Sequence, residues 1–159
     1  FLREPGAGES PMHAAWHRAA SNLLGLAPSD YHGADYIDAG LVVWRRENVT
    51  RLIAHLQREG GDWRARLVAA GEFSEYVLYG VFVDQVLGEQ AQHTPTPLRQ
   101  CLTLWDASAA REAETAINGL QPYQRAMAVQ STIAVDDGAR HALVESAIRK
   151  AAEQDRRAL

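Results

Sequence analysis

The sequence predicts an α/β fold, in which a helix-rich layered domain contains a small, mainly buried sheet. Apolar residues recur at helical spacing in several segments, and three short apolar runs have the length of strands. A helical segment follows each run. The resulting order is helix, strand, three helices, strand, helix, strand, helix, which is typical of layered α/β proteins. At this length we expect residues 1–159 to form a single domain.

The first predicted helix and strand follow a loop over residues 4–11. Met12 to Leu24 has helical apolar spacing, and Gly25 can end that helix. Pro28 to Gly33 predicts a turn. Ala39 to Trp44 is short, apolar and rich in Val, which favours a strand buried on both faces.

Three helices are predicted next. Val49 to Leu56 carries apolar residues at i, i+3, i+4 and i+7, and Gly60-Gly61 interrupts the pattern. A short helix should run from Asp62, its N-cap, to about Ala70. Ser74 should cap a helix that continues through Leu87 to Gly88 and is apolar on nearly every side, so we expect it in the core.

The C-terminal part predicts two more strands, each followed by a helix. His93 to Pro97 is a second loop, and Cys101 to Trp105 reads as a strand. A helix from Ser108 to about Asn118 precedes the last strand, Met127 to Ile133. Helical spacing then returns from Asp137 to Gln154.

Composition excludes several classes of protein. The net charge is −4, whereas a nucleic-acid surface is normally basic, so we expect no nucleic-acid partner. No apolar run approaches the ~20 residues of a transmembrane helix. Cys101 is the single cysteine, which rules out a disulfide framework and fits a reducing, cytoplasmic location. His13 and His17 lie four residues apart, but no third metal ligand is evident.

Glu75 is the strongest candidate for a catalytic residue. It lies in the first turn of the predicted core helix, with Tyr76 and Tyr79 nearby. A carboxylate there could accept the proton of an attacking hydroxyl group. However, an acidic residue in a first turn also gains roughly 0.3–1 kcal/mol from the helix dipole. Taken alone, Glu75 favours the dipole explanation.

The other candidates lie at strand ends, where ligands bind in open α/β sheets. Asp38 could hold sugar hydroxyl groups or bond its own turn, and Gly40 leaves room for a ligand or a neighbouring backbone. Trp44 could stack on a sugar or base, while Arg45 and Arg46 could clamp a phosphate; the alternative is a core indole beside surface arginines. Three further candidates share one sheet edge if the strands are parallel: Trp105, Gln130 and Ser131.

Residues 35–46 and residues 73–80 together resemble a bacterial family of uncharacterised proteins that is grouped with the GT-A type of nucleotide-sugar glycosyltransferases. The helix at 12–17 and the late strand at 129–132 match as well. The resemblance implies that this chain is the C-terminal part of a GT-A-like fold. It also implies transfer of a sugar from a nucleotide-sugar donor to a glycan or another hydroxyl acceptor, with Glu75 as the base.

The resemblance further implies a divalent metal, Mn or Mg. GT-A enzymes bind it through an Asp-x-Asp motif that usually sits just before a segment resembling residues 1–5, so the metal ligands would lie outside this chain and the isolated chain would be inactive. Residues 36–40 also resemble the Tyr-x-Asn-x-Gly region of glycogenin-like transferases near the donor sugar, with Asp38 in place of Asn.

The competing interpretation is a non-catalytic α/β scaffold or glycan-binding module. In that case Glu75 stabilises the helix dipole, and the tyrosines are core residues with satisfied hydroxyl groups. The enzyme interpretation requires Asp38, an arginine of the 45–46 pair and Glu75 to converge on one cleft.

Overall fold

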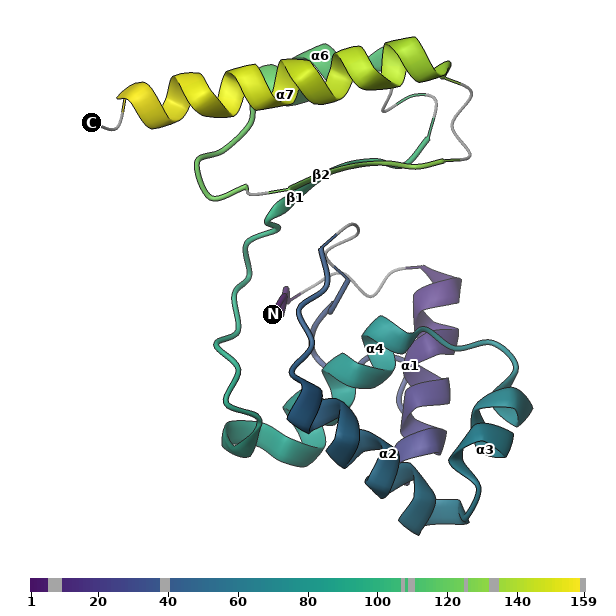
Figure 1. The fold of residues 1–159 in the computed structure, drawn as a ribbon. Helices are drawn as coiled ribbons and strands as arrows, with labels where there is room; N and C mark the ends of the chain where they lie inside the picture. The colour runs from purple at the N-terminus through teal and green to yellow at the C-terminus, as the bar shows by residue number, and fades with distance from the viewer. Residues whose placement is uncertain are drawn as a thin grey trace. The chain divides into compact units, whose positions relative to one another are not determined.

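The computed structural model describes residues 1–5, 10–37, 41–106, 108, 111–124, 126–131 and 135–157. The chain divides into two compact units (Figure 1). Unit 1 comprises Phe1–Ile37 and Val42–Pro97, and unit 2 is built mainly from Leu98–Leu159. A single domain over the whole chain stays a prediction.

Unit 1 is helical. Its helices are α1 (Pro11–Leu24), α2 (Arg46–Gly60), α3 (Trp63–Ala70) and α4 (Glu75–Val81), and α4 continues into a π-helical turn (Phe82–Leu87) and a 3₁₀ turn (Gly88–Ala91). The four predicted helices are therefore confirmed. The wider π-helical turn was not predicted, because a helix that is apolar on nearly every side has no apolar stripe whose shift would reveal such a turn.

The predicted helix ends are also confirmed. Gly25 follows α1 with a φ of 67°, in the left-handed region that favours glycine. The Asp62 carboxylate accepts a hydrogen bond from the Arg64 N–H at the start of α3. The Ser74 hydroxyl oxygen accepts one from the Val77 N–H at the start of α4. Each cap satisfies an N–H group that has no partner within its helix.

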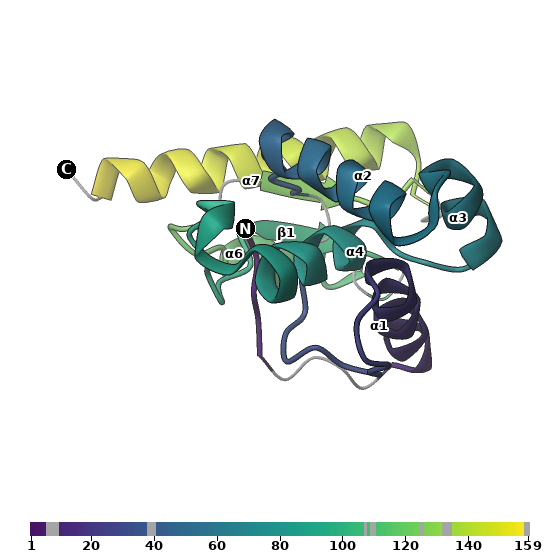
Figure 2. The ribbon, with the colours of Figure 1, turned by 90° about the horizontal axis from the view of Figure 1, so that it is seen from below.

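The core of unit 1 forms where α1 packs against α2, α3 and α4 (Figures 1 and 2). The all-apolar pattern of residues 74–87 correctly predicts a core helix, since nearly all of α4 beyond its first turn is buried. The largest fully buried apolar side chains of the unit are Leu24, Leu56, Val77, Val81 and Phe82.

Gly80 allows the ring of Tyr36 to lie directly on α4. A Cβ atom at position 80 would lie 2.2 Å from the Tyr36 Cγ and 2.5 Å from its Cβ. Tyr36 is buried, and its hydroxyl group donates to the Asp84 carboxylate at 3.0 Å. The ring therefore cannot withdraw without losing this hydrogen bond.

We expect Gly80→Ala to lower the free energy of unfolding of unit 1 by about 2 kcal/mol, because overpacking a filled core forces side chains and backbone to shift. Urea denaturation, followed by backbone NMR signals of α1 and α4, measures this loss. Gly119→Ala in unit 2 is the matched control, since its Cβ would meet no atom closer than 3.5 Å. Equal urea midpoints for Gly80→Ala and the unsubstituted protein would contradict the close packing.

The predicted buried strand at 39–44 is wrong over its described part. Residues 41–45 are in neither a strand nor a helix, and Val42 and Val43 are 41% and 52% exposed. No strand among the described residues pairs with this segment, and a short apolar run needs a partner strand to satisfy its backbone groups. Asp38, Ala39 and Gly40 lie outside the described residues.

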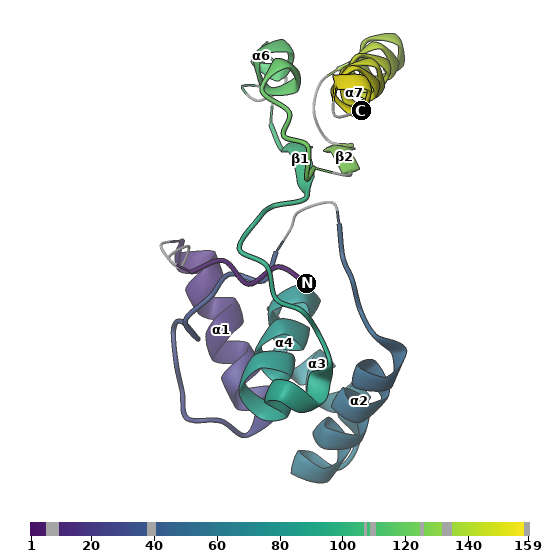
Figure 3. The ribbon, with the colours of Figure 1, turned by 90° about the vertical axis from the view of Figure 1, so that its left-hand side faces the viewer.

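Unit 2 contains a parallel βαβ arrangement. Strand β1 (Cys101–Leu104) pairs with β2 (Ala126–Val129), α6 (Ala113–Asn118) connects them, and α7 (Asp137–Arg157) follows β2. Both helices lie on the same face of the sheet (Figures 1 and 3). The α/β, helix-rich prediction with a small sheet is thus confirmed, since the described residues form a two-stranded parallel sheet.

The core of unit 2 lies between this sheet and its helices. Leu104 and Ala113 are buried, and Met127, Val129, Val135 and Leu143 pack against them. Cys101 is also buried, whereas the residues of β2 are half-buried.

Several element bounds in unit 2 differ from the predictions, two of them by more than three residues. The continuous part of the helix predicted from Ser108 begins at Ala113, and the strand predicted over Met127 to Ile133 ends at Val129. Ile133 itself lies outside the described residues. Of the helices that the structure describes, none is long and apolar enough to cross a membrane.

Candidate functional site

An exposed tryptophan lies against two tyrosines in unit 1. The indole of Trp44 is 45% exposed, and its ring centroid is 5.6 Å from that of Tyr79 and 6.3 Å from that of Tyr76. Tyr79 is buried and Tyr76 is half-buried, so the indole packs against the surface of α4. We call these three side chains the aromatic cluster. They are three of the predicted site residues.

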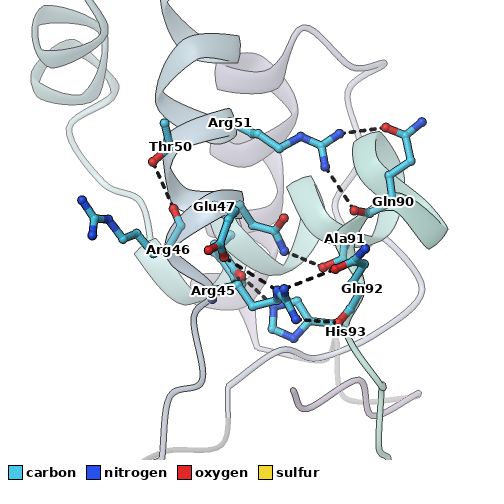
Figure 4. Close-up of polar contacts among 11 residues, drawn as sticks. Arg45, Arg46, Glu47, Thr50, Arg51, Gln90, Ala91, Gln92 and His93 are labelled. Carbon is cyan, nitrogen blue, oxygen red and sulfur yellow. Dashed lines mark hydrogen bonds and ion pairs between the residues drawn. The ribbon is translucent and has the colours of Figure 1, made fainter.

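The aromatic cluster is tied to the start of α2 through the Tyr79 hydroxyl group. Its oxygen accepts a hydrogen bond from the Arg45 backbone N–H at 3.0 Å, and it lies 2.7 Å from His93 Nε2. The Arg45 guanidinium donates to the backbone oxygen and the Oε1 of Gln92, both at 3.3 Å (Figure 4). The structure thus brings Trp44, Arg45 and Tyr79 together. The convergence of Asp38, an arginine and Glu75 that the enzyme interpretation requires stays a prediction, since Asp38 lies outside the described residues.

Two further contacts join α2 to the chain before His93. Asn48 is buried and its Nδ2 donates to the Ala91 backbone oxygen at 2.8 Å. Arg51 donates to the backbone oxygen and the Oε1 of Gln90 at 3.1 and 2.8 Å (Figure 4). Together with the Arg45–Gln92 contact, they form a row of hydrogen bonds that fixes the position of α2.

The paired arginines do not point the same way. Arg45 turns toward Gln92, while Arg46 extends away from this row (Figure 4). Arg46 is exposed, and its guanidinium has no hydrogen bond or ion pair with the described residues. Because Arg46 is the cation left without a partner here, it is better placed than Arg45 to receive a ligand anion.

Glu75 opens α4 directly before Tyr76. Its side chain is exposed and makes no hydrogen bond or ion pair within the described part of the chain. The apolar residues of α4 therefore do not bury the Glu75 carboxylate. A solvated acid at this position interacts with the N-terminal end of the helix dipole, and it is also accessible to an incoming hydroxyl group.

The remaining described candidates lie in unit 2. Trp105 and Gln130 follow the ends of β1 and β2, and the Gln130 N–H donates to the Leu104 backbone oxygen at 3.0 Å. Because the strands are parallel, these residues and Ser131 share one edge of the sheet, which confirms that part of the prediction. Trp105 is 51% exposed. Their role in substrate binding stays a prediction.

His93 is the residue of this site that sequence reasoning missed. Its ring is packed against Phe1 and Tyr79, and burial lowers its pKa, assisted by the charge of Arg45. A hollow of about 290 Å³ adjoins it, with Asp84 and Glu89 also in its lining. Only the position of His93, soon after the helix-ending Gly88, could have drawn attention to it.

His17 of α1 is a second group of interest, and its burial was not predicted. It is 2% exposed, and its Nδ1 has no hydrogen-bond partner among the residues that the structure describes. Its ring centroid lies 5.4 Å from that of Tyr31 and 5.7 Å from that of His32. Burial lowers its pKa to about 4. His13 instead stacks on Trp16. No group of three or more His, Cys, Asp or Glu side chains that could hold a metal lies among the described residues.

The sequence matches a family of unknown function (DUF6492) over residues 7–149. The chain belongs to the DUF6492 family. This match includes α1 to α4 of unit 1 and both strands of unit 2, so the aromatic cluster and the sheet edge both lie in the part that this DUF6492 chain shares with its family. Neither a curated protein nor a solved structure matches the chain.

Proposed function

We propose that this protein transfers a sugar from a nucleotide-sugar donor to a hydroxyl group of a glycan or another acceptor. The observation that carries the proposal is the exposed indole of Trp44, held on two tyrosines and followed directly by Arg45 and Arg46. An exposed aromatic face can stack on a base or sugar ring. A guanidinium group beside it can bind the oxygens of a diphosphate.

In this proposal Trp44 stacks on the donor and Arg46 binds its diphosphate. The acceptor oxygen attacks the anomeric carbon and forms the new glycosidic bond. The bond from that carbon to the diphosphate oxygen breaks, and its electron pair leaves with the nucleoside diphosphate. Glu75 takes the proton of the acceptor hydroxyl group, as a general base.

The proposal includes a cytoplasmic location and a divalent metal, Mn or Mg, with ligands outside this chain. The described residues do not supply a ligand set for such a metal. No step of the reaction is therefore assigned to it.

Trp44→Ala should raise the KM for the donor roughly tenfold and leave kcat unchanged, because base–aromatic stacking contributes about 1–3 kcal/mol to binding. The measurement is donor hydrolysis and transfer by the protein expressed from its complete reading frame, with a panel of UDP-, GDP- and CMP-linked sugars. Trp44→Phe, which keeps an aromatic face, should recover most of the affinity.

Arg46→Ala should also raise the donor KM. Arg58→Ala is its matched control, since Arg58 is an exposed arginine in the last turn of the same helix. The proposal fails if no nucleotide-sugar is turned over, or if Arg58→Ala raises the donor KM as much as Arg46→Ala does.

The exposure of Glu75 favours a second candidate, a glycan-binding module without catalysis. In that function Glu75 stabilises α4, and the exposed indole of Trp44 binds a sugar ring of a glycan. Saturable binding of a glycan without turnover of any nucleotide-sugar would support this candidate over the enzyme.

A further inference from the structure

Tyr79 contacts both the main chain and a side chain of residues 44–46, the segment that carries the proposed donor site. It is 3% exposed, so its hydroxyl group is out of reach of a ligand on the surface. That hydroxyl oxygen accepts the Arg45 N–H at 3.0 Å, and the Tyr79 ring supports the indole of Trp44. One buried side chain thus sets the position of two residues that follow each other in sequence.

His93 fixes the Tyr79 hydroxyl group from the other side, at 2.7 Å. Because burial lowers the pKa of His93, its ring is neutral near pH 7, and an unprotonated Nε2 can accept a hydrogen bond from the Tyr79 hydroxyl group. The Tyr79 oxygen then keeps its lone pairs for the Arg45 N–H. Gln92, the residue before His93, holds the Arg45 guanidinium.

We infer that Tyr79 is a positioning residue, which does not itself contact the ligand. It holds the indole of Trp44 and the main chain of Arg45, directly before Arg46, in the geometry that binds the donor. The inference rests on the proposed function for the identity of the ligand. The holding of the segment can be tested without any ligand.

The first test is amide hydrogen exchange of the unliganded protein. In Tyr79→Phe the ring remains but the Arg45 N–H loses its acceptor, so its exchange should become roughly tenfold faster, the usual effect of one hydrogen bond. The change should be confined to residues 44–46. Unchanged exchange at Arg45 would overturn the inference.

The second test is the KM for the donor. Tyr79→Phe should raise it roughly tenfold with kcat retained, since the loss affects binding of the ground state and the transition state alike. Asp62→Ala is the control for stability, because it removes the cap of α3 without touching the segment. An equal rise of KM in Asp62→Ala would overturn the inference.

The two tests separate the inference from the proposed function. A protein that turns over no nucleotide-sugar contradicts the proposed function, and amide exchange at Arg45 still decides whether Tyr79 holds the segment. A protein that turns over a donor equally well with Phe at position 79 contradicts the inference alone.

Discussion

Unit 1 is expected to lose about 3 kcal/mol of stability as the pH falls from 6.5 to 4, the two values between which the pKa of His17 moves on folding. Burial lowers the pKa of His17 in the folded chain to about 4, and the neighbouring His32 and His13 act in the same direction, while Asp35 opposes them. The pKa of His32 is also lowered by burial, which adds to the effect.

The direction follows from proton binding. Between pH 6.5 and 4 the unfolded chain binds a proton at His17 and the folded chain does not, so lowering the pH favours unfolding. The full stability is present above pH 6.5. Below about pH 4 both states are protonated and this contribution has been lost.

Urea denaturation at several pH values, followed by NMR signals of α1, measures this loss. His17→Leu should flatten the dependence on pH over the same range, because it removes the titrating group from the core. His141→Gln is the control, since His141 is an exposed residue of α7 in unit 2. An unchanged pH dependence in His17→Leu would show that another group causes the loss.

Glu75→Gln is expected to lower kcat for sugar transfer at least 100-fold, with little change in the KM for the donor. A general base contributes about 10²–10⁴-fold to a reaction rate, and an amide cannot take the proton of the acceptor hydroxyl group. The same change removes a charge from the first turn of α4, which should cost less than about 1 kcal/mol of stability. The lower kcat of Glu75→Gln should therefore not result from unfolding of the protein.

Glu72→Gln provides the matched comparison, because Glu72 is an exposed acid just before α4. Steady-state transfer with saturating donor and acceptor should give normal rates for this variant. If Glu75→Gln also transfers sugar at the normal rate, Glu75 is not the base, and its charge serves only the helix.

Local sequence signals were sufficient for most of the fold. Asp62 and Ser74 were predicted as helix caps, and glycines ended the helices, because these effects act over a few residues. The same signals failed at residues 41–45, since an apolar run becomes a strand only when a partner strand is present. The two strands with helices beside them, β1 and β2, were predicted near their observed positions.

The sequence predicted which residues belong to the candidate site better than it predicted the contacts between them. Trp44, Arg45 and Tyr79 were selected from two separate segments, and the structure brings them together. Their link to His93 depends on how α4 continues through a π-helical turn, which places residue 93 beside residue 79. The exposure of Glu75 likewise follows from packing, which the apolar pattern around it does not reveal.

The most direct test of the proposed donor site is NMR titration of the protein, expressed from its complete reading frame, with uridine diphosphate and guanosine diphosphate. We predict saturable shifts centred on the Trp44 indole and on the amides of Arg45 and Arg46. Shifts confined to other parts of the protein, or none with either nucleotide, would contradict the assignment of this surface to a nucleotide-sugar donor.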